Sequence, residues 1–129
     1  MSNMDSSISK VNSNGSVANK IQNNLEFKII TGELAPGEKF PSIRELAETY
    51  KIGTVTAQAI VTNLSKDEII TKKPGVGFFV MPYVKGKLVQ KHTSECKKML
   101  KRVIEYAVRF GLDPEAIVAE VFKEENIKG

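Results

Sequence analysis

Between Gly53 and Gln58 the chain reads GTVTAQ, a short run of small and hydrogen-bonding side chains. Threonine hydroxyls can bond to a base or a phosphate, and a glutamine amide can pair bidentately with adenine. Thr54, Thr56 and Gln58 therefore have the chemistry to read base pairs, and Val55 could touch a thymine methyl group. The alternative is that both threonines only cap a helix. The two interpretations stay open for Thr54, whereas contact is favoured for Thr56 and Gln58 because neither fits an apolar stripe.

Ser42 and Arg44 lie at the start of a preceding predicted helix. Free backbone N–H groups and the helix dipole favour a phosphate at such a position, and the arginine would hold that phosphate. The alternative is that Ser42 only caps the helix and that Arg44 only pairs with Glu48, four residues further on.

A third candidate group lies in the stretch KKPGVGFFV. Lys72 and Lys73 can neutralise the charge of a DNA backbone, and Gly75 and Gly77 would let a hairpin tip approach the minor groove closely. An ordinary solvated hairpin would carry similar residues, but we expect contact with DNA.

No group of residues predicts catalysis. The sequence contains no recognisable nucleophile with an adjacent base, no phosphate-cradling glycine loop and no metal cluster. His92 and Cys96 stand four apart, but two ligands alone do not make a zinc site, so a boundary histidine and a core cysteine are the better interpretation. We therefore expect no catalytic residues, no metal, no cofactor and no enzymatic activity.

Three predicted helices position the candidate residues. The first begins after Ser16 as N-cap, ends at Gly32, and has apolar residues at every fourth position, namely Val17, Ile21, Leu25 and Ile29. The sequence Ser42-x-x-Glu45 is a capping box that opens a second helix, through about Tyr50, with an inner face of Ile43, Leu46 and Ala47. The third helix runs from about Thr54 to Ser65 and would bury Ala57, Ile60, Val61 and Leu64. Two short helices separated by three residues indicate a helix-turn-helix.

The remaining sequence predicts a wing and a helical tail. The runs EIITKK and GFFVM flank Pro-Gly-Val and indicate a β-hairpin, which would be the wing. Residues 83–92 have glycine and proline breaks nearby and are predicted to be a connector. A helix from Thr93 to Phe110 follows, and Asp113-Pro114 opens a last helix that runs to about Asn126.

The two tail helices are amphipathic and cannot bury both of their apolar faces by themselves, so they must pack against the winged helix or against a second copy of the chain. The first has Cys96 on its apolar face and the second has Ile117. We expect a second copy of the chain to cover these faces, through Met99, Leu100, Val103, Ala107, Phe110, Val118, Val121 and Phe122.

Composition sets only loose limits. The 129 residues are 41% apolar and 26% charged, with no apolar run of about 18 residues, so we expect a soluble protein without a membrane partner. Residues 1–15 lack the pattern of a secretory signal and are predicted to be a disordered polar arm, and the single cysteine fits the cytoplasm. The net charge of +4 is concentrated in the tail, because residues 16–84 carry eight Lys/Arg against seven Asp/Glu. Charge alone therefore does not indicate nucleic acid.

The stretches GELAPGEKFPSIRELA, KIGTVTAQAIVTNL and GVGFFV resemble the GntR family of bacterial regulators, whose DNA-binding domain shows GxLxPGxxLPSxRxLA, a recognition helix and a GxGxFV wing. The similarity spans about Val17 to Val80. The short helical tail looks like the YtrA-like branch, which implies a small homodimer, dimerisation through the tail, palindromic operators and repression of transport operons, often including the regulator's own gene. Carried over by position, the resemblance implies DNA contacts at Ser42, Arg44, Thr56 and Gly77.

The chain departs from the family pattern at Thr54, where the family usually has an arginine, at Ala57 in place of valine, and at Phe78 in place of a wing threonine. The missing arginine removes a base or phosphate contact. It motivates a second hypothesis, an interaction protein with a degenerate DNA-binding domain that acts by pairing with another regulator. A ligand-binding or enzymatic module is a third, which has only the unexplained tail surface in its favour.

The sequence thus predicts a mainly helical α+β protein. Residues 16–82 form a winged helix-turn-helix that binds double-stranded DNA at a palindromic operator, and residues 93–127 form a helical hairpin for dimerisation. The operator, the regulated genes and any small-molecule effector cannot be read from the sequence.

Overall fold

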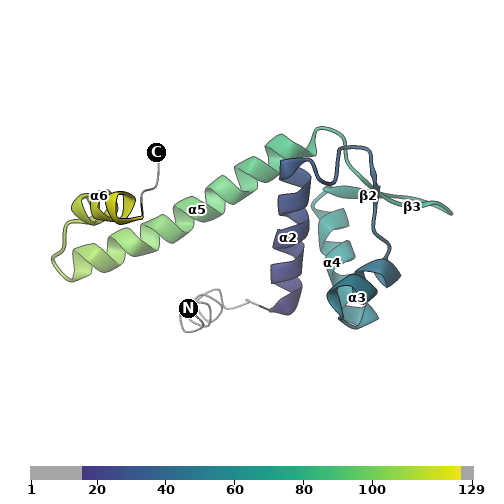
Figure 1. Cartoon of the computed structure of the whole chain (residues 1–129), viewed down its shortest axis with the longest axis horizontal. Coiled ribbons are helices and arrows are strands. Elements are labelled where there is room, and N and C mark those ends of the chain that lie inside the picture. The colour runs from purple at the N-terminus through teal and green to yellow at the C-terminus, as the bar shows by residue number, and fades with distance from the viewer. Residues whose placement is uncertain (1–15, 126–129) are drawn as a thin grey trace. The chain divides into compact units, whose positions relative to one another are not determined.

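The computed structural model describes residues 16–125, so the predicted polar arm and the end of the predicted last helix lie outside the described residues. The elements in order are α2 (Val17–Thr31), β1 (Lys39–Phe40), α3 (Ile43–Tyr50), α4 (Thr54–Lys66), β2 (Ile70–Lys73), β3 (Gly77–Val80), α5 (Val84–Arg109) and α6 (Pro114–Glu124) (Figure 1). The chain divides between Val89 and Gln90 into two compact units. The fold is mainly helical α+β, as predicted.

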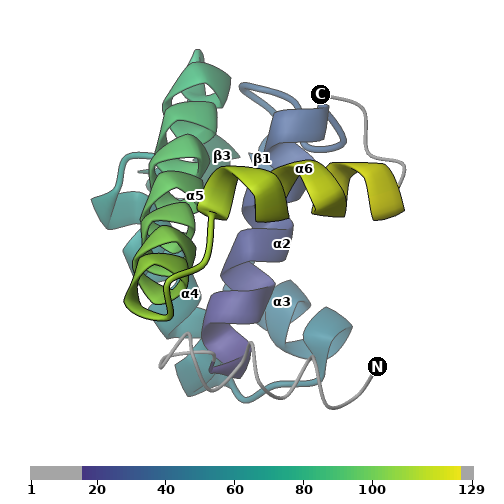
Figure 2. The same cartoon turned by 90° about the vertical axis from the view of Figure 1, so that its left-hand side faces the viewer.

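In the first unit, α4 packs against α2, α3 and β2. The helix pair α3 and α4 is the predicted helix-turn-helix, and Figure 2 gives a second view of α2 beside it. Its turn is closed by Lys51 in the left-handed conformation, with φ 54°, and by a hydrogen bond of 3.0 Å from the Ile52 N–H to the Ala47 carbonyl. The core comprises Ile21, Leu25, Ile29, Phe40, Leu46, Ala57, Ile60, Val61, Leu64, Ile69, Ile70, Val80, Val84 and Leu88.

The predicted inner face of α2 is correct except at Val17, whose side chain is 59% exposed. A helix has 3.6 residues per turn, so positions four apart drift by about 40° at each step. Over three steps this drift carries Val17 away from the face that buries Leu25 and Ile29. Glu26 is fully buried instead, and its carboxylate accepts a hydrogen bond of 3.2 Å from the Gln22 amide.

The wing contains one strand more than the sequence predicts. Strands β2 and β3 form the expected hairpin, but β1 pairs with the other side of β3, which gives an antiparallel sheet of order β1-β3-β2. Further bonds, from the Gly37 N–H to the Val80 carbonyl (2.8 Å) and from the Val80 N–H to the Glu38 carbonyl (2.9 Å), extend this pairing. The wing is therefore hydrogen-bonded to the segment that precedes α3.

The predicted connector, residues 83–92, is wrong, because α5 begins at Val84 and runs as one 26-residue helix. Val84 and Leu88 lie one turn apart and are buried in the core of the first unit. Gly86 costs a helix only about 1 kcal/mol relative to alanine, which burial of these two side chains offsets. The chain changes direction at Tyr83, directly before α5, where this non-glycine residue has a left-handed φ of 60°.

The second unit consists of the rest of α5 and of α6. As predicted, Asp113 caps α6 by accepting a hydrogen bond of 3.1 Å from the Glu115 N–H, and Pro114 occupies the first turn. No residue of α6 within the described part of the chain is buried. Helices α2 to α6 include none that is long and apolar enough to cross a membrane.

Candidate nucleic-acid interface

The start of α3 is organised by a reciprocal capping box. The Glu45 N–H donates to the Ser42 hydroxyl oxygen at 3.0 Å, and the Ser42 N–H donates to the Glu45 carboxylate at 2.8 Å. The backbone and side-chain hydrogen bonds of Ser42, together with the charge of Lys39, hold the pKa of Glu45 below its usual value. Ser42 therefore has the capping role that was one of its two interpretations, and a contact between Ser42 and a phosphate stays a prediction.

Arg44 projects from the first turn of α3 and is exposed. The alternative interpretation paired this guanidinium with Glu48. The structure forms no ion pair within 4.0 Å between Arg44 and Glu48 in the described part of the chain. The guanidinium is thus free to meet an external anion beside the capped helix start.

The start of α4 presents the predicted reading residues. Gly53 is the N-cap, and no side chain caps this helix, so neither threonine has the capping role considered as the alternative. Thr54 is exposed, Thr56 is half-buried, and Val55 is 83% exposed. The exposed Gln58 amide donates to the Thr62 hydroxyl at 3.2 Å, which leaves its oxygen and one N–H for a base edge.

Gly53 has no conformational or packing reason to be glycine. Its backbone, with φ −73° and ψ 161°, suits any residue, and an added Cβ would meet no atom within 4 Å. Glycine is one of the residues favoured at an N-cap, and it also leaves room for an external backbone to approach. Close approach of DNA to Gly53 is therefore a prediction.

The wing lysines are held over aromatic rings. The Lys73 ammonium lies 4.3 Å from the centroid of Phe79, and the Lys72 ammonium lies 5.9 Å from that of Phe78. Both lysines are exposed, so their charges remain available to an anion. The aromatic residue at position 78, where the family usually has threonine, thus supports a lysine.

The wing glycines have a structural role of their own. Gly75 and Gly77 have φ values of 76° and 137°, which side chains rarely adopt, so the turn itself requires them. This explains both residues without DNA, and close approach to the minor groove stays a prediction. Sequence reasoning missed β1, which adds Lys39 to the same sheet.

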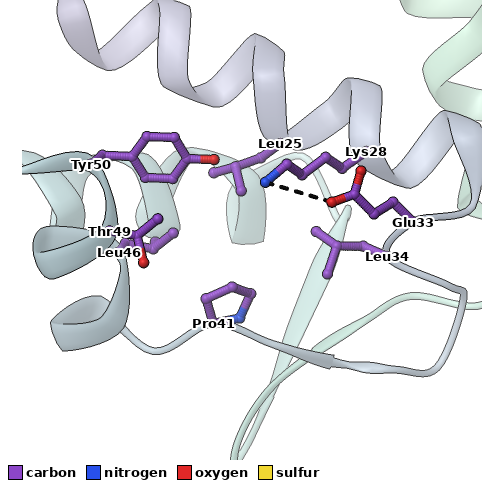
Figure 3. Close-up of a pocket in the computed structure, with 8 residues that line it drawn as sticks. All are labelled: Leu25, Lys28, Glu33, Leu34, Pro41, Leu46, Thr49 and Tyr50. Atoms are coloured by element: carbon purple, nitrogen blue, oxygen red, sulfur yellow. Dashed lines mark ion pairs between the residues drawn. The ribbon is translucent and has the colours of Figure 1, made fainter.

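A shallow hollow lies on another part of the first unit, between α2, the following loop and α3 (Figure 3). Its floor is apolar, with Leu25, Leu34 and Leu46, and an ion pair of 3.9 Å between Lys28 and Glu33 closes one side. The volume of about 210 Å³ is below the roughly 300–1,000 Å³ of most small-molecule sites. A hollow of this size is not evidence of a binding site for a small-molecule effector.

The predicted dimerisation residues of the second unit are exposed, with one exception. Met99, Leu100, Val103, Phe110, Val118, Val121 and Phe122 are between 36% and 61% exposed, whereas Ala107 is buried within the single chain. Sequence reasoning missed further exposed apolar residues on the same helices and their junction, namely Ile104, Tyr106, Val108 and Leu112. Cys96 was predicted to lie in a core and is instead exposed.

Among the described residues, no three His, Cys, Asp or Glu side chains are grouped so as to hold a metal ion. His92 is half-buried and lies in the interior of α5, not at the boundary of a helix.

The three-helix core, the helix-turn-helix and the three-stranded wing together define a winged helix-turn-helix protein. The model of the bacterial regulatory proteins of the gntR family matches residues 17–80. The HTH-type transcriptional repressor YtrA of Bacillus subtilis is 30% identical over 88 residues, which are 68% of this chain and 68% of YtrA. The chain therefore belongs to the GntR family and is a DNA-binding transcription regulator.

Two further comparisons agree. The uncharacterised HTH-type transcriptional regulator YhcF of the same organism is 30% identical over 61 residues, which cover 47% of this chain and only half of YhcF. A solved GntR family transcriptional regulator from Listeria monocytogenes is 27% identical, with a TM-score of 0.71, over 84% of this chain and 94% of that one. The resemblance to this family and to YtrA is thus confirmed, and a family of regulatory proteins agrees with the expectation that the chain is not an enzyme.

Proposed function

We propose that the protein is a cytoplasmic homodimer that binds a palindromic operator and represses a transport-related operon, which can include its own gene. The observation that carries this proposal is the start of α4, where Thr54, Val55 and Gln58 are exposed and no side chain is used as a cap. A recognition helix enters the major groove with its N-terminal residues, so these side chains would meet base edges. Repression is proposed because the name of the related YtrA describes a repressor.

DNA-backbone contacts would surround this reading site. Ser42 and Arg44 at the start of α3, and Lys72, Lys73 and the glycine tip of the wing, are the proposed contacts to phosphates and the minor groove. The free guanidinium of Arg44 supports the first group, and the exposed lysines of the wing support the second.

Homodimerisation is supported by the exposed apolar residues of α5 and α6. Seven of the eight proposed residues retain more than a third of their exposure in the single chain, which is costly for leucine, valine and phenylalanine in water. A two-fold dimer would carry two recognition helices about 34 Å apart and would read half-sites one helical turn from each other.

Selection of bound duplexes from a random-sequence pool tests this proposal. We expect a palindromic consensus with half-sites one turn apart, and a single dimeric species in sedimentation. If about six phosphates are contacted, log affinity should fall against log salt with a slope near −5. Affinity that does not change with salt, or selected sequences without a repeated half-site, would contradict the proposal.

A second candidate is a regulator that has lost tight DNA binding and acts by pairing with a related protein. The exposed Thr54 in place of an arginine favours it, as does the near balance of charge in residues 16–84. Under this alternative the homodimer retains no fragment in a genome-wide pull-down, whereas a related subunit co-purifies with it. Recovery of one defined set of fragments by the homodimer alone would exclude it.

A further inference from the structure

Strand β1 adds a lysine to one face of the wing. Lys39 is paired with Phe79 of β3, and Phe79 is paired with Thr71 of β2. Directly paired residues share a face, and so do residues two apart along a strand. Lys39 and Lys73 therefore lie on the same face as Phe79, while Lys72 lies with Phe78 on the opposite face. The contacts of Lys73 with the Phe79 ring and of Lys72 with the Phe78 ring agree with this arrangement.

The Lys39 side chain lies against the hairpin where its last strand begins. A Cβ added to Gly77 would come within 3.2 Å of the Lys39 Cε atom and 3.9 Å of its ammonium. The aliphatic part of the lysine thus crosses the surface left open by this glycine, with the charged end beside the first residue of β3. Gly77 provides the room for the Lys39 side chain as well as the backbone conformation of the turn.

The ammonium group of Lys39 is available to an external anion. The residue is exposed, and it has no ion pair within 4.0 Å in the described residues. Its charge does reach the Glu45 carboxylate, whose pKa it helps to lower. Lys39 therefore belongs to the wing sheet and acts electrostatically on the start of α3, and both regions are proposed above to contact the DNA backbone.

We propose that Lys39 is a phosphate contact of the wing, and that Lys39 and Lys73 form a positively charged strip on the sheet face that carries Phe79. The inference rests on the DNA-binding role proposed above. The ring of Phe79 supports Lys73, and the surface of Gly77 supports Lys39, so both ammonium groups are pre-oriented before DNA arrives. Less side-chain entropy is then lost when each one meets a phosphate.

The alternative role for Lys39 is structural support of the α3 capping box through Glu45. The two roles are separated by a salt titration of the full chain with a duplex that the wild type selects from a random pool. Each phosphate contact contributes about 0.9 to the slope of log affinity against log salt. We expect Lys39→Gln to reduce the steepness of the slope by about 0.9 and to weaken binding to selected and unselected duplexes alike, while Lys39→Arg restores the slope.

Lys66→Gln is the matched control, because Lys66 is an exposed lysine in the last turn of α4, at the opposite end from the proposed reading residues. Its slope should equal that of the wild type. An unchanged slope for Lys39→Gln, with a lower melting temperature, would overturn the inference and assign Lys39 to the capping box alone. Failure of the wild type to bind any duplex would instead overturn the proposed function and the inference with it.

Discussion

Gly53 allows stability and DNA binding to be separated in one substitution, Gly53→Ser. The residue has N-cap geometry in the extended region, its helix has no side-chain cap, and space is open around a new Cβ. Serine at an N-cap is better than glycine by a few tenths of a kcal/mol, a net difference that includes the smaller freedom of serine in the unfolded chain. The expected gain is about 0.2–0.5 kcal/mol, or roughly 1–4 °C in melting temperature for a unit of this size.

The same substitution should weaken DNA binding. If the sugar-phosphate backbone approaches Gly53 closely, a hydroxymethyl group there causes a steric conflict of about 1–3 kcal/mol. Affinity should fall by a factor between about 5 and about 140, since 1.4 kcal/mol corresponds to a factor of ten. Thermal unfolding followed by circular dichroism gives the first quantity, and fluorescence anisotropy with a labelled selected duplex gives the second.

Gly86→Ala is the matched control. Gly86 is an exposed glycine inside α5 with open space around it, so alanine should stabilise the helix by about 1 kcal/mol and leave DNA affinity unchanged. If Gly53→Ser were more stable and bound DNA as tightly as the wild type, the close approach of DNA to this glycine would be refuted. If Gly53→Ser were less stable, the account of the α4 N-cap would be wrong.

Three other substitutions test the remaining parts of the structure. Arg44→Ala should weaken binding to all sequences alike and reduce the steepness of log affinity against log salt by about 0.9, measured by anisotropy between about 50 and 200 mM salt. A loss of affinity confined to one DNA sequence would contradict a phosphate contact. Ser42→Ala should cost about 1 kcal/mol of stability in thermal unfolding. Because the folded pKa of Glu45 is lowered, the contribution of its carboxylate to stability is present above the unfolded pKa of about 4.5 and is lost as the pH falls through the folded value. The difference in stability between Ser42→Ala and the wild type should therefore shrink in acid. A difference that stays constant with pH would refute the coupling between Ser42 and Glu45. Val121→Glu, at a residue 44% exposed in the single chain, should shift sedimentation towards the monomer without changing the helix content, and a dimer that persists would place the interface elsewhere.

The helix-turn-helix could be predicted because its signals are local. The box from Ser42 to Glu45 fixes one helix start, and the spacing of Ala57, Ile60 and Leu64 fixes one buried face. Each signal operates within about two helical turns, so the surrounding fold does not alter it. The same holds for Asp113-Pro114 at the start of α6.

The predictions failed where packing between distant residues decides the structure. Strand β1 is two residues long and exists only because β3 pairs with it, so its own sequence gives no strand pattern. Lys39 was missed for this reason. The connector was predicted from Pro82 and Gly86, although Val84 and Leu88, four residues apart, were the signal for a helix whose buried face continues the core of the first unit.

The candidate site could be predicted only in part. Exposure of Val55 and absence of a cap on α4 are structural facts that the residue types could only suggest. The positive φ values of Gly75 and Gly77 depend on the turn that forms between two strands, and sequence alone left their role open between turn and DNA contact.

The pairing of Lys39 with Phe79 also bears on how the protein folds. The two strands close a loop in the chain that contains the whole of α3, α4 and β2. Closing a long loop costs entropy before its contacts stabilise it, so this pairing is expected to form after the local helical turns and together with the core. The start of α3, the start of α4 and the wing then become ordered in one cooperative step. A partly folded chain therefore has none of the binding surface, and no intermediate carries only a part of it.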